Sequence, residues 1–174
     1  NVTMNKADYV QMRIFAPEFK MPCKLDDRYS YIEISEYSQE KDLLKIIDSI
    51  NETLSDWKDR PDVDNLKKRF DVGCSCFIQY FKGEVSGWFW TCNFLTYDWV
   101  EKVKDLPTPN SNYSGGTYVI KKVAPRNAGY QLYAYCIQKV MSRTDYGYAY
   151  VDKWNKAPIR LNFNCGATYV DNLL

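Results

Sequence analysis

Apolar residues recur at helical spacing in some segments of the sequence and form strand-like runs in others, and this pattern restricts the fold more than any other feature. Residues 43–57 carry leucine, isoleucine and tryptophan at spacings of three and four, which gives one apolar stripe on a helix. We expect this helix to begin near Ser38 and to end before Pro61. Downstream, Ser75–Phe81 and Val85–Cys92 are rich in aromatic and β-branched residues and are joined by a short turn that contains glycine, which predicts a β-hairpin. Such a chain folds as a sheet packed against helices.

The rest of the chain divides into elements by the same criteria. We expect further strands at Tyr29–Ile34, Gly116–Val123, Gly147–Trp154 and Thr168–Leu173, and further helices at Val63–Phe70, Gln131–Ser142 and Lys156–Phe163. Residues 1–28 show no regular pattern, so an irregular N-terminal extension is expected there. A long connection is expected over Thr96–Ser114. The 174 residues suit a single domain, 1–174, of the mixed α/β class, with a central mixed sheet and helices on both faces.

The charge balance separates this chain from nucleic-acid and membrane proteins. It has 23 basic and 22 acidic residues, a net charge of +1, whereas a nucleic-acid binder shows a basic excess or stripe. No apolar run reaches the ~18 residues that span a bilayer, and no signal segment opens the sequence. We therefore expect a cytoplasmic protein that acts on small molecules, without nucleic-acid or membrane partners. A homodimer is an arrangement that the sequence leaves open.

The absence of histidine excludes several mechanisms. With no histidine in the chain, neither a Ser–His–Asp nor a Cys–His nucleophilic system can form. The sequence also lacks a C-x-x-C pair, so we expect no metal. Its six cysteines are embedded in aromatic and aliphatic runs, and we expect them to be reduced and structural.

The segment from Thr117 to Met141 carries the clearest chemical signal. An expected strand ends in Pro125-Arg126-Asn127-Ala128-Gly129 and a helix follows. Helix N-termini present unpaired backbone N–H groups and a partial positive charge, which suit phosphate. Gly129 permits close approach of a ligand and a positive φ. An ordinary strand-to-helix turn is the alternative interpretation.

These residues resemble a motif of the GNAT superfamily of N-acyltransferases. Val123-Ala124-Pro125 followed by Arg126-x-x-Gly129 looks like a shortened V-x-P-x-x-[RQ]-x-x-G-x-[GA], with Gln131 in place of the usual small residue. Asn155-x-x-Pro158 with Gly166 is similar to the pattern that closes the family's domain. Gly83-Glu84-Val85-Ser86-Gly87-Trp88 looks like the family's central hairpin. The resemblance extends over about residues 29–170 and implies a GNAT-like fold.

The resemblance implies acetyl-CoA, or another acyl-CoA, as the co-substrate. In the family the strand before the turn separates from the next parallel strand, and pantetheine lies between them. Here main-chain groups near Lys121–Val123 would bind pantetheine, and the turn would wrap the pyrophosphate. The implied cofactor-binding residues are Lys121, Val123, Arg126, Asn127, Ala128, Gly129, Tyr130, Gln131 and Asn155. Candidate substrate-binding aromatics are Trp88, Trp90, Tyr97 and Tyr118, with core packing as the alternative for the two tryptophans.

The catalytic residue cannot be assigned from the resemblance. Many members place a proton-donating tyrosine where this chain has Asn162, and a carboxylate on the strand before the turn, where this chain has none. The preferred hypothesis is acyl transfer from CoA to a primary amine of a small molecule, with an amino sugar as the best guess. The second is a degenerate domain that binds CoA or another ligand without catalysis. The third is an unrelated α/β interaction domain.

Overall fold

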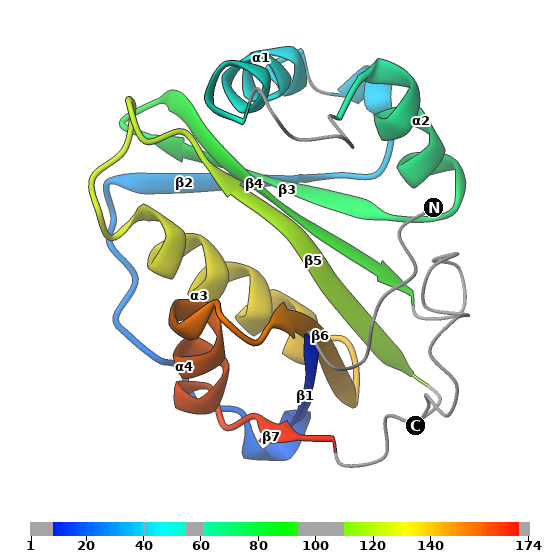
Figure 1. Ribbon diagram of the computed structural model, residues 1–174, viewed down its shortest axis with the longest axis vertical. Helices are drawn as coiled ribbons and strands as arrows, with labels where there is room; N and C mark the ends of the chain where they lie inside the picture. Colours follow the sequence, from blue (N-terminus) through cyan, green and yellow to red (C-terminus); the bar gives the residue numbers. More distant parts are fainter. Residues whose placement is uncertain (1–8, 40, 55–60, 94–109, 171–174) are drawn as a thin grey trace.

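The computed structural model describes residues 9–39, 41–54, 61–93 and 110–170. In these residues one seven-stranded sheet lies between two helical layers (Figure 1). Helices α1 (Leu43–Thr53) and α2 (Val63–Asp71) cover one face, while α3 (Ala128–Met141) and α4 (Lys156–Asn164) cover the other. The expected fold class, a mixed sheet flanked by helices on both faces, is confirmed. None of the described helices is long and apolar enough to cross a membrane.

The sheet is mixed, with the order β2-β3-β4-β5-β6-β1-β7. Its strands are β1 (Tyr9–Phe15), β2 (Tyr29–Ile34), β3 (Ser75–Phe81), β4 (Glu84–Asn93), β5 (Ser111–Val119), β6 (Tyr146–Asp152) and β7 (Thr168–Tyr169), with 3-10 turns at Ala16–Glu18 and Tyr37–Gln39. β5 and β6 pair in parallel, and the other neighbouring strands pair antiparallel. The crossover from β5 to β6 runs through α3, as a parallel pair requires.

The N-terminal strand β1 corrects the expectation of an irregular segment over residues 1–28. β1 lies between β6 and β7 and pairs with β6 along its full length, from Tyr9 opposite Asp152 to Phe15 opposite Tyr146. Its apolar residues Met12 and Ile14 are buried and alternate with Gln11 and Arg13. The period-2 signal was therefore present, but it was short and included two polar residues.

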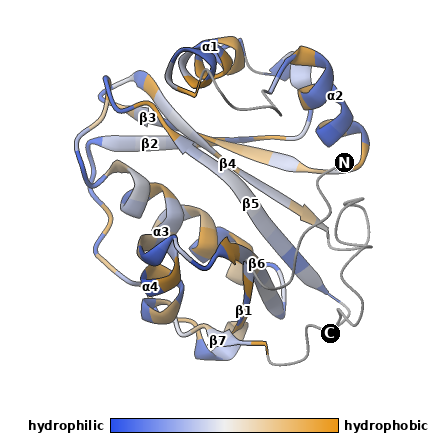
Figure 2. Ribbon diagram, in the orientation of Figure 1, coloured by the Kyte–Doolittle hydropathy of each residue, from blue (hydrophilic) through white to orange (hydrophobic). Residues whose placement is uncertain are grey.

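Alternate residues of the strands divide the core into two layers. On β4, Trp88 and Trp90 pack with α1 and α2, whereas the intervening Phe89 packs with α3. The stripe on α1 is confirmed, since Leu43, Ile46, Ile47 and Ile50 are its buried residues. In Figure 2 the turns of α1 carry both hydrophobic and hydrophilic residues, as expected of a helix with one buried side. Tertiary burial of these stripes holds the short helices in place.

The bounds around the expected site differ from those predicted. β5 begins at Ser111 rather than Gly116 and ends at Val119 rather than Val123. Its first residues, Ser-Asn-Tyr-Ser-Gly-Gly, read as a loop by composition, yet Asn112, Tyr113 and Ser114 among them pair with both β4 and β6. After Ile120 the chain turns, with the Val123 and Ala124 N–H groups both bonded to the Ile120 carbonyl. Lys121 and Val123 therefore lie in a turn beyond the strand.

Smaller differences affect three other elements. α3 begins at Ala128 rather than Gln131, so that Gly129 lies in its first turn. β6 ends at Asp152, and Trp154 follows in a turn with 75% of its surface exposed. β7 is limited to Thr168–Tyr169, and the end of the expected strand, residues 171–174, lies outside the described residues, as do residues 55–60 at the end of the expected first helix.

Candidate functional site

The parallel strands β5 and β6 pair only over their first residues. Ser111–Ser114 pair with Tyr146–Ala149, and within the described chain no pairing joins the two strands beyond that point. β5 continues to Val119, where it still pairs with β4 through Gly87. The edge of β5 that faces β6 is thus left without a strand partner over its second half. Backbone N–H and C=O groups on such an edge are available to a ligand.

A bulge in β5 begins where the strands separate. Trp88 is opposite Tyr118 and Trp90 is opposite Gly115, so Gly116 and Thr117 together stand opposite a single residue of β4. Gly116 has a φ of +71°, a conformation that glycine adopts without strain. Such bulges bend a strand and increase its twist. The bulge accounts for the direction in which β5 leaves β6.

The carboxyl ends of β5 and β6 lie at the same edge of the sheet because the strands are parallel. α3 and α4 both begin at this edge, since each follows one of these strands. The Ala128 N–H donates to the Pro125 carbonyl at 3.0 Å, and the Gln131 N–H donates to the Asn127 carbonyl at 2.9 Å. Between them, the N–H groups of Gly129 and Tyr130 have no hydrogen-bond partner among the described residues. Two free amides at a helix N-terminus favour an anion.

A cavity of about 570 Å³ opens at this N-terminus. It is lined by Val119, Lys121, Ala124, Pro125, Arg126 and Gly129. Lys121 and Arg126 are exposed, and neither is in an ion pair with a described residue. The neighbouring Lys122 differs, because its Nζ lies 3.3 Å from a carboxylate oxygen of Glu52. The cavity therefore combines free main-chain amides with two unpaired cations, the features that bind a phosphate group.

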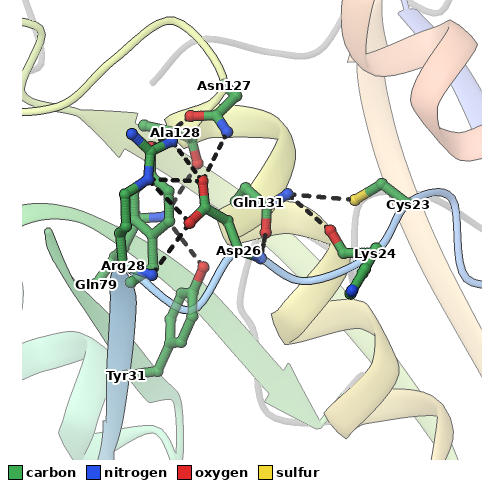
Figure 3. A network of polar contacts seen from close by, with 10 residues as sticks. Cys23, Lys24, Asp26, Arg28, Tyr31, Gln79, Asn127, Ala128 and Gln131 are labelled. Atoms are coloured by element: carbon green, nitrogen blue, oxygen red, sulfur yellow. Dashed lines mark hydrogen bonds and ion pairs between the residues drawn. The ribbon is translucent and has the colours of Figure 1, made fainter.

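The side chain of Gln131 bonds the segment before β2 and does not line this cavity, while its expected role as a cofactor ligand stays a prediction. It is 6% exposed, its Oε1 accepts from the Asp26 N–H at 2.8 Å, and its Nε2 donates to the Lys24 carbonyl at 3.0 Å (Figure 3). The Gln131 backbone N–H is also occupied, by the Asn127 carbonyl. Gln131 binds the segment before β2 to α3, so that its bulk does not obstruct the helix N-terminus.

The side chain of Asn127 is also bonded to residues at and just before the start of β2. Its Oδ1 accepts from the Tyr29 hydroxyl at 2.6 Å, and its Nδ2 donates to Asp26 Oδ2 at 3.2 Å. The side chain makes no capping bond to α3. A direct side-chain contact to a ligand would break these bonds. In the structure the side chain of Asn127 therefore fixes the turn to the segment around Asp26 and Tyr29.

Asp26 introduces a negative charge near the start of α3 that Arg28 neutralises. Arg28 Nη2 lies 2.5 Å from Asp26 Oδ2, and Arg28 Nε and the Arg28 N–H both donate to Oδ1 (Figure 3). The side-chain and backbone hydrogen bonds from Arg28, with a further one from Asn127, hold the pKa of the Asp26 carboxyl well below its usual range. Asp26 is therefore ionised and paired at neutral pH.

Ala128, Gly129 and Tyr130 form the first turn of α3. Ala128 is 1% exposed, and its carbonyl accepts from Gln79 Nε2 at 3.0 Å, which binds the helix to β3. Gly129 does not have a positive φ, so the conformational reason for a glycine there is not used. A Cβ at Gly129 would meet only Val119 Cγ2, at 3.8 Å. The Tyr130 hydroxyl lies 3.4 Å from the Pro22 carbonyl oxygen, on the side of the N-terminal segment.

The two asparagines near α4 occupy different environments. Asn155 directly precedes α4, and its side chain has no hydrogen-bond partner among the described residues. Asn162 is 2% exposed and lies between α3 and α4, where its Oδ1 accepts from the Tyr133 hydroxyl at 2.8 Å and its Nδ2 donates to the Pro158 carbonyl at 2.8 Å. Burial raises the pKa of Tyr133. Asn162 therefore joins two helices and does not face the cavity.

Three of the four candidate acceptor aromatics lie in the α1–α2 layer. Trp88 and Trp90 are 4% and 3% exposed and contact each other edge to face, with ring centroids 5.7 Å apart. They pack as core residues, the alternative stated for them above. The Tyr118 hydroxyl is bonded to Ser49 and Thr53 of α1. Tyr97 lies outside the described residues.

Sequence reasoning missed the residues that support the turn from behind. Gln79 is fully buried, and its amide bonds Ser86, Tyr31 and the Ala128 carbonyl. Asp26 bonds α3 across 105 residues of sequence. A buried glutamine in the middle of an aromatic strand is the one signal that could have indicated Gln79, since a buried amide requires partners. Nothing in the sequence pattern indicated Asp26.

Comparisons with known proteins find similarity in structure rather than in sequence. No family model matches the chain, and no curated protein sequence matches it significantly. A tandem GNAT protein from the clavulanic acid biosynthesis pathway superposes with a TM-score of 0.60 at 13% identity, over 93% of this chain and 50% of that one. A GCN5-related N-acetyltransferase from Sphaerobacter thermophilus gives 0.60 at 12% identity, over 94% and 48%. This chain thus spans about half the length of these two structures.

A third similar structure has nearly the size of this chain. It is an aminoglycoside acetyltransferase from an uncultured soil metagenomic sample, with a TM-score of 0.56 at 11% identity over 82% of this chain and 90% of that one. Each of the three structures superposes on the sheet and helices of this chain at low sequence identity. Together with the parallel strands that separate in the middle of the sheet, they establish that this chain has the GCN5-related N-acetyltransferase fold.

Proposed function

We propose that this protein transfers an acyl group from CoA to a primary amine of a small molecule. The observation that supports the proposal is the coincidence of three features at one edge of the sheet. The unpaired edge of β5, the free amides of Gly129 and Tyr130, and the cations Lys121 and Arg126 all lie where β5 leads into α3. A CoA thioester needs a donor-lined strand edge for its amides and an anion site for its pyrophosphate, in that order along its length.

The residues present fit such a co-substrate. Main-chain amides would hold the pyrophosphate at the α3 N-terminus, with Lys121 and Arg126 supplying the compensating charge. The β6-facing edge of β5 would bond the pantetheine arm through backbone groups. Gly129 adds no side chain at the approach to the helix, and the position is open enough that a Cβ there would make only an ordinary contact with Val119 Cγ2 at 3.8 Å. Asn155, with its side-chain amide unengaged, would approach the arm from the end of β6.

The chemistry would depend on orientation and on main-chain dipoles. A neutral amine would attack the acyl carbon of the thioester, the C–N bond would form as the C–S bond breaks, and the CoA thiolate would leave and take up the proton that the amine loses through water. A backbone N–H of the bulge at Gly116–Thr117 would stabilise the negative charge that develops on the thioester oxygen. No carboxylate lines the cavity among the described residues, and Asn162 is buried between helices. Holding the amine and the acyl carbon together supplies the larger share of the acceleration in this arrangement.

For the acceptor we propose an amino sugar or a similar polar amine. The support is the likeness to the aminoglycoside acetyltransferase, which is matched over 90% of its own length. Binding of CoA without catalysis is the second candidate function. The observation that favours it is the position of Asn162, whose Oδ1 is bonded to Tyr133 of α3, whose Nδ2 is bonded within α4, and which cannot transfer a proton at neutral pH.

The test is acetyl-CoA binding by wild type and by two variants at one position. Gly129→Asp places a carboxylate where we expect the pyrophosphate, while an acidic residue in the first turn of a helix leaves the fold stable or improves it. Gly129→Ala adds the same Cβ without charge and serves as the control. Calorimetric titration should show binding for wild type and Gly129→Ala and loss of binding for Gly129→Asp.

Thermal shift provides a second readout of the same binding. Acetyl-CoA at 100 times its dissociation constant should stabilise the wild-type fold by ~2.7 kcal/mol. Equal affinity in all three proteins would exclude the pyrophosphate site. Binding in wild type, without turnover of any amine in a panel of aminoglycosides, polyamines and amino acids, would select the second candidate function.

A further inference from the structure

A pair of cysteines on neighbouring strands lies outside the proposed site. Cys74 directly precedes β3, and Cys92 is the penultimate residue of β4. The register of the hairpin places Ser75 opposite Thr91 and Cys76 opposite Trp90, so the same register sets Cys74 opposite Cys92. Both side chains lie on the α1–α2 face, are 2% and 3% exposed, and line the same small cavity.

The end of α2 fixes the position of Cys74. The Gly73 N–H donates to the Phe70 carbonyl at 2.9 Å and the Cys74 N–H donates to the Arg69 carbonyl at 3.0 Å, while Gly73 has a φ of +93°. These are the two bonds of a Schellman motif with a left-handed glycine. The motif connects α2 directly to β3 and brings the Cys74 side chain next to that of Arg69.

Arg69 provides a cation beside the pair. Its guanidinium lies 5.0 Å from the Trp90 ring centroid, and it lines with both cysteines a cavity of about 10 Å³, room for about one water-sized molecule. The hydrogen bond from Cys92, and then the charge of Arg69, lower the pKa of the Cys74 thiol against the effect of burial. The same hydrogen bond, together with burial, raises the pKa of Cys92. The shared hydrogen bond and Arg69 thus favour Cys74 over Cys92 as the thiolate of the pair.

We propose that Cys74 and Cys92 are a redox pair that a peroxide converts into a cross-strand disulfide. The Cys74 thiolate attacks one oxygen of hydrogen peroxide, which forms a Cys74 sulfenic acid and releases hydroxide. The Cys92 sulfur then attacks the Cys74 sulfur, and the sulfenic oxygen departs as water. In total, two thiols and one peroxide give one disulfide and two waters.

The geometry of facing residues suits this bond. Residues directly opposite in an antiparallel pair have Cα atoms about 4.5–5.5 Å apart, and disulfides span about 4.4–6.8 Å. All six cysteines are thiols in the structure. Cys76, on the same strand and face, stands opposite Trp90 and has no cysteine across the pair. Selectivity for Cys74 and Cys92 therefore follows from register.

The experiment treats the purified wild-type protein with stoichiometric hydrogen peroxide and measures its intact mass, followed by peptide mapping without reduction. We expect the mass to fall by two hydrogens, a 74–92 cross-linked peptide, and reversal by dithiothreitol. The melting temperature of the oxidised form should rise by about 5 °C or more, because the bond closes a loop in the unfolded chain. Mapping of wild type needs no variant to fold.

Variants then test the assignment. Cys92→Ser should leave Cys74 as a sulfenic acid that dimedone traps, whereas Cys76→Ala should form the 74–92 bond as wild type does. Stable free thiols at 74 and 92 after peroxide treatment, or a disulfide that joins other cysteines, would overturn the proposal. Neither result bears on CoA binding, since none of these cysteines lines the cavity at α3.

Discussion

Replacing Gln131 by alanine would decide between two roles for this residue. If its amide contacted a ligand, the variant would lose affinity and keep its stability. The structure gives the opposite expectation, because the amide holds Asp26 and Lys24 of the N-terminal segment against α3. Gln131→Ala should therefore lose stability, while the N–H groups of Gly129 and Tyr130 stay available for a ligand.

The size of the loss follows from two hydrogen bonds and a buried side chain. Truncation leaves the Asp26 N–H and the Lys24 carbonyl without their partner in a half-buried contact, at about 1 kcal/mol or more each. Removal of a buried methylene adds ~0.8 kcal/mol, and the higher helix propensity of alanine returns a few tenths. We expect a decrease of about 2–4 kcal/mol in the free energy of unfolding. For a chain of this size that lowers the melting temperature by about 4–16 °C.

Urea denaturation of wild type, Gln131→Ala and Gln138→Ala would measure the difference. Gln138 lies on the same helix but is exposed, so its replacement should change stability by less than ~0.5 kcal/mol. Acetyl-CoA titration of the same proteins reports on the site. If Gln131→Ala is as stable as Gln138→Ala but binds acetyl-CoA more weakly, the reasoning is refuted and Gln131 contacts the ligand.

Two further predictions concern the stability of the fold. Gly166→Ala should cost more than ~2 kcal/mol in urea denaturation, because Gly166 has a φ of +93° and a Cβ would meet the Glu18 carbonyl oxygen at 2.4 Å. Gly83→Ala is the control, because Gly83 has a φ of +83° but no atom lies within 4 Å of an added Cβ, so only the ~1–2 kcal/mol of backbone strain is expected. Equal losses for the two variants would show that the close approach at Gly166 is absent. The pKa of Asp26 lies below its unfolded value of ~3.9, so the unfolded state binds the proton first as the pH falls. The stabilisation is therefore complete above about pH 5 and is lost progressively as the pH falls from the unfolded pKa through the lower folded pKa. Urea midpoints at pH 6 and pH 3 should therefore differ more for wild type than for Asp26→Asn, and an equal difference would contradict the pairing with Arg28.

The elements that were predicted correctly have strong local patterns. The hairpin of β3 and β4 is predicted by its two runs of aromatic and β-branched residues around a glycine turn, and α1 is predicted by its single buried stripe. β1 and the first half of β5 were missed because their pairing is not local. β1 pairs with a strand more than 130 residues later, and the first half of β5 is held as a strand by β4 and β6, which both pair with residues 112–114. Tertiary pairing overrode local propensity in both cases.

The candidate site was predictable only where it depends on the backbone. A strand followed by a turn and a helix indicated an anion site at residues 126–130, and the structure puts free amides and a cavity there. The side-chain roles were not predictable in the same way. Gln131 and Asn127 stand at motif positions, yet their amides bond a segment about 100 residues earlier, and no pattern in one sequence reveals such a contact.

This difference also explains how the fold is recognisable when the sequence is not. A site made from main-chain amides requires a strand that ends, a helix that begins and a residue without a bulky side chain between them. Many sequences meet these conditions, because the recognising atoms are common to all residues other than proline. The side chains that hold the turn in place, such as Gln79 and Gln131, can be replaced by other combinations with the same result. The same fold at sequence identities of 11–13% is what such replacements would produce.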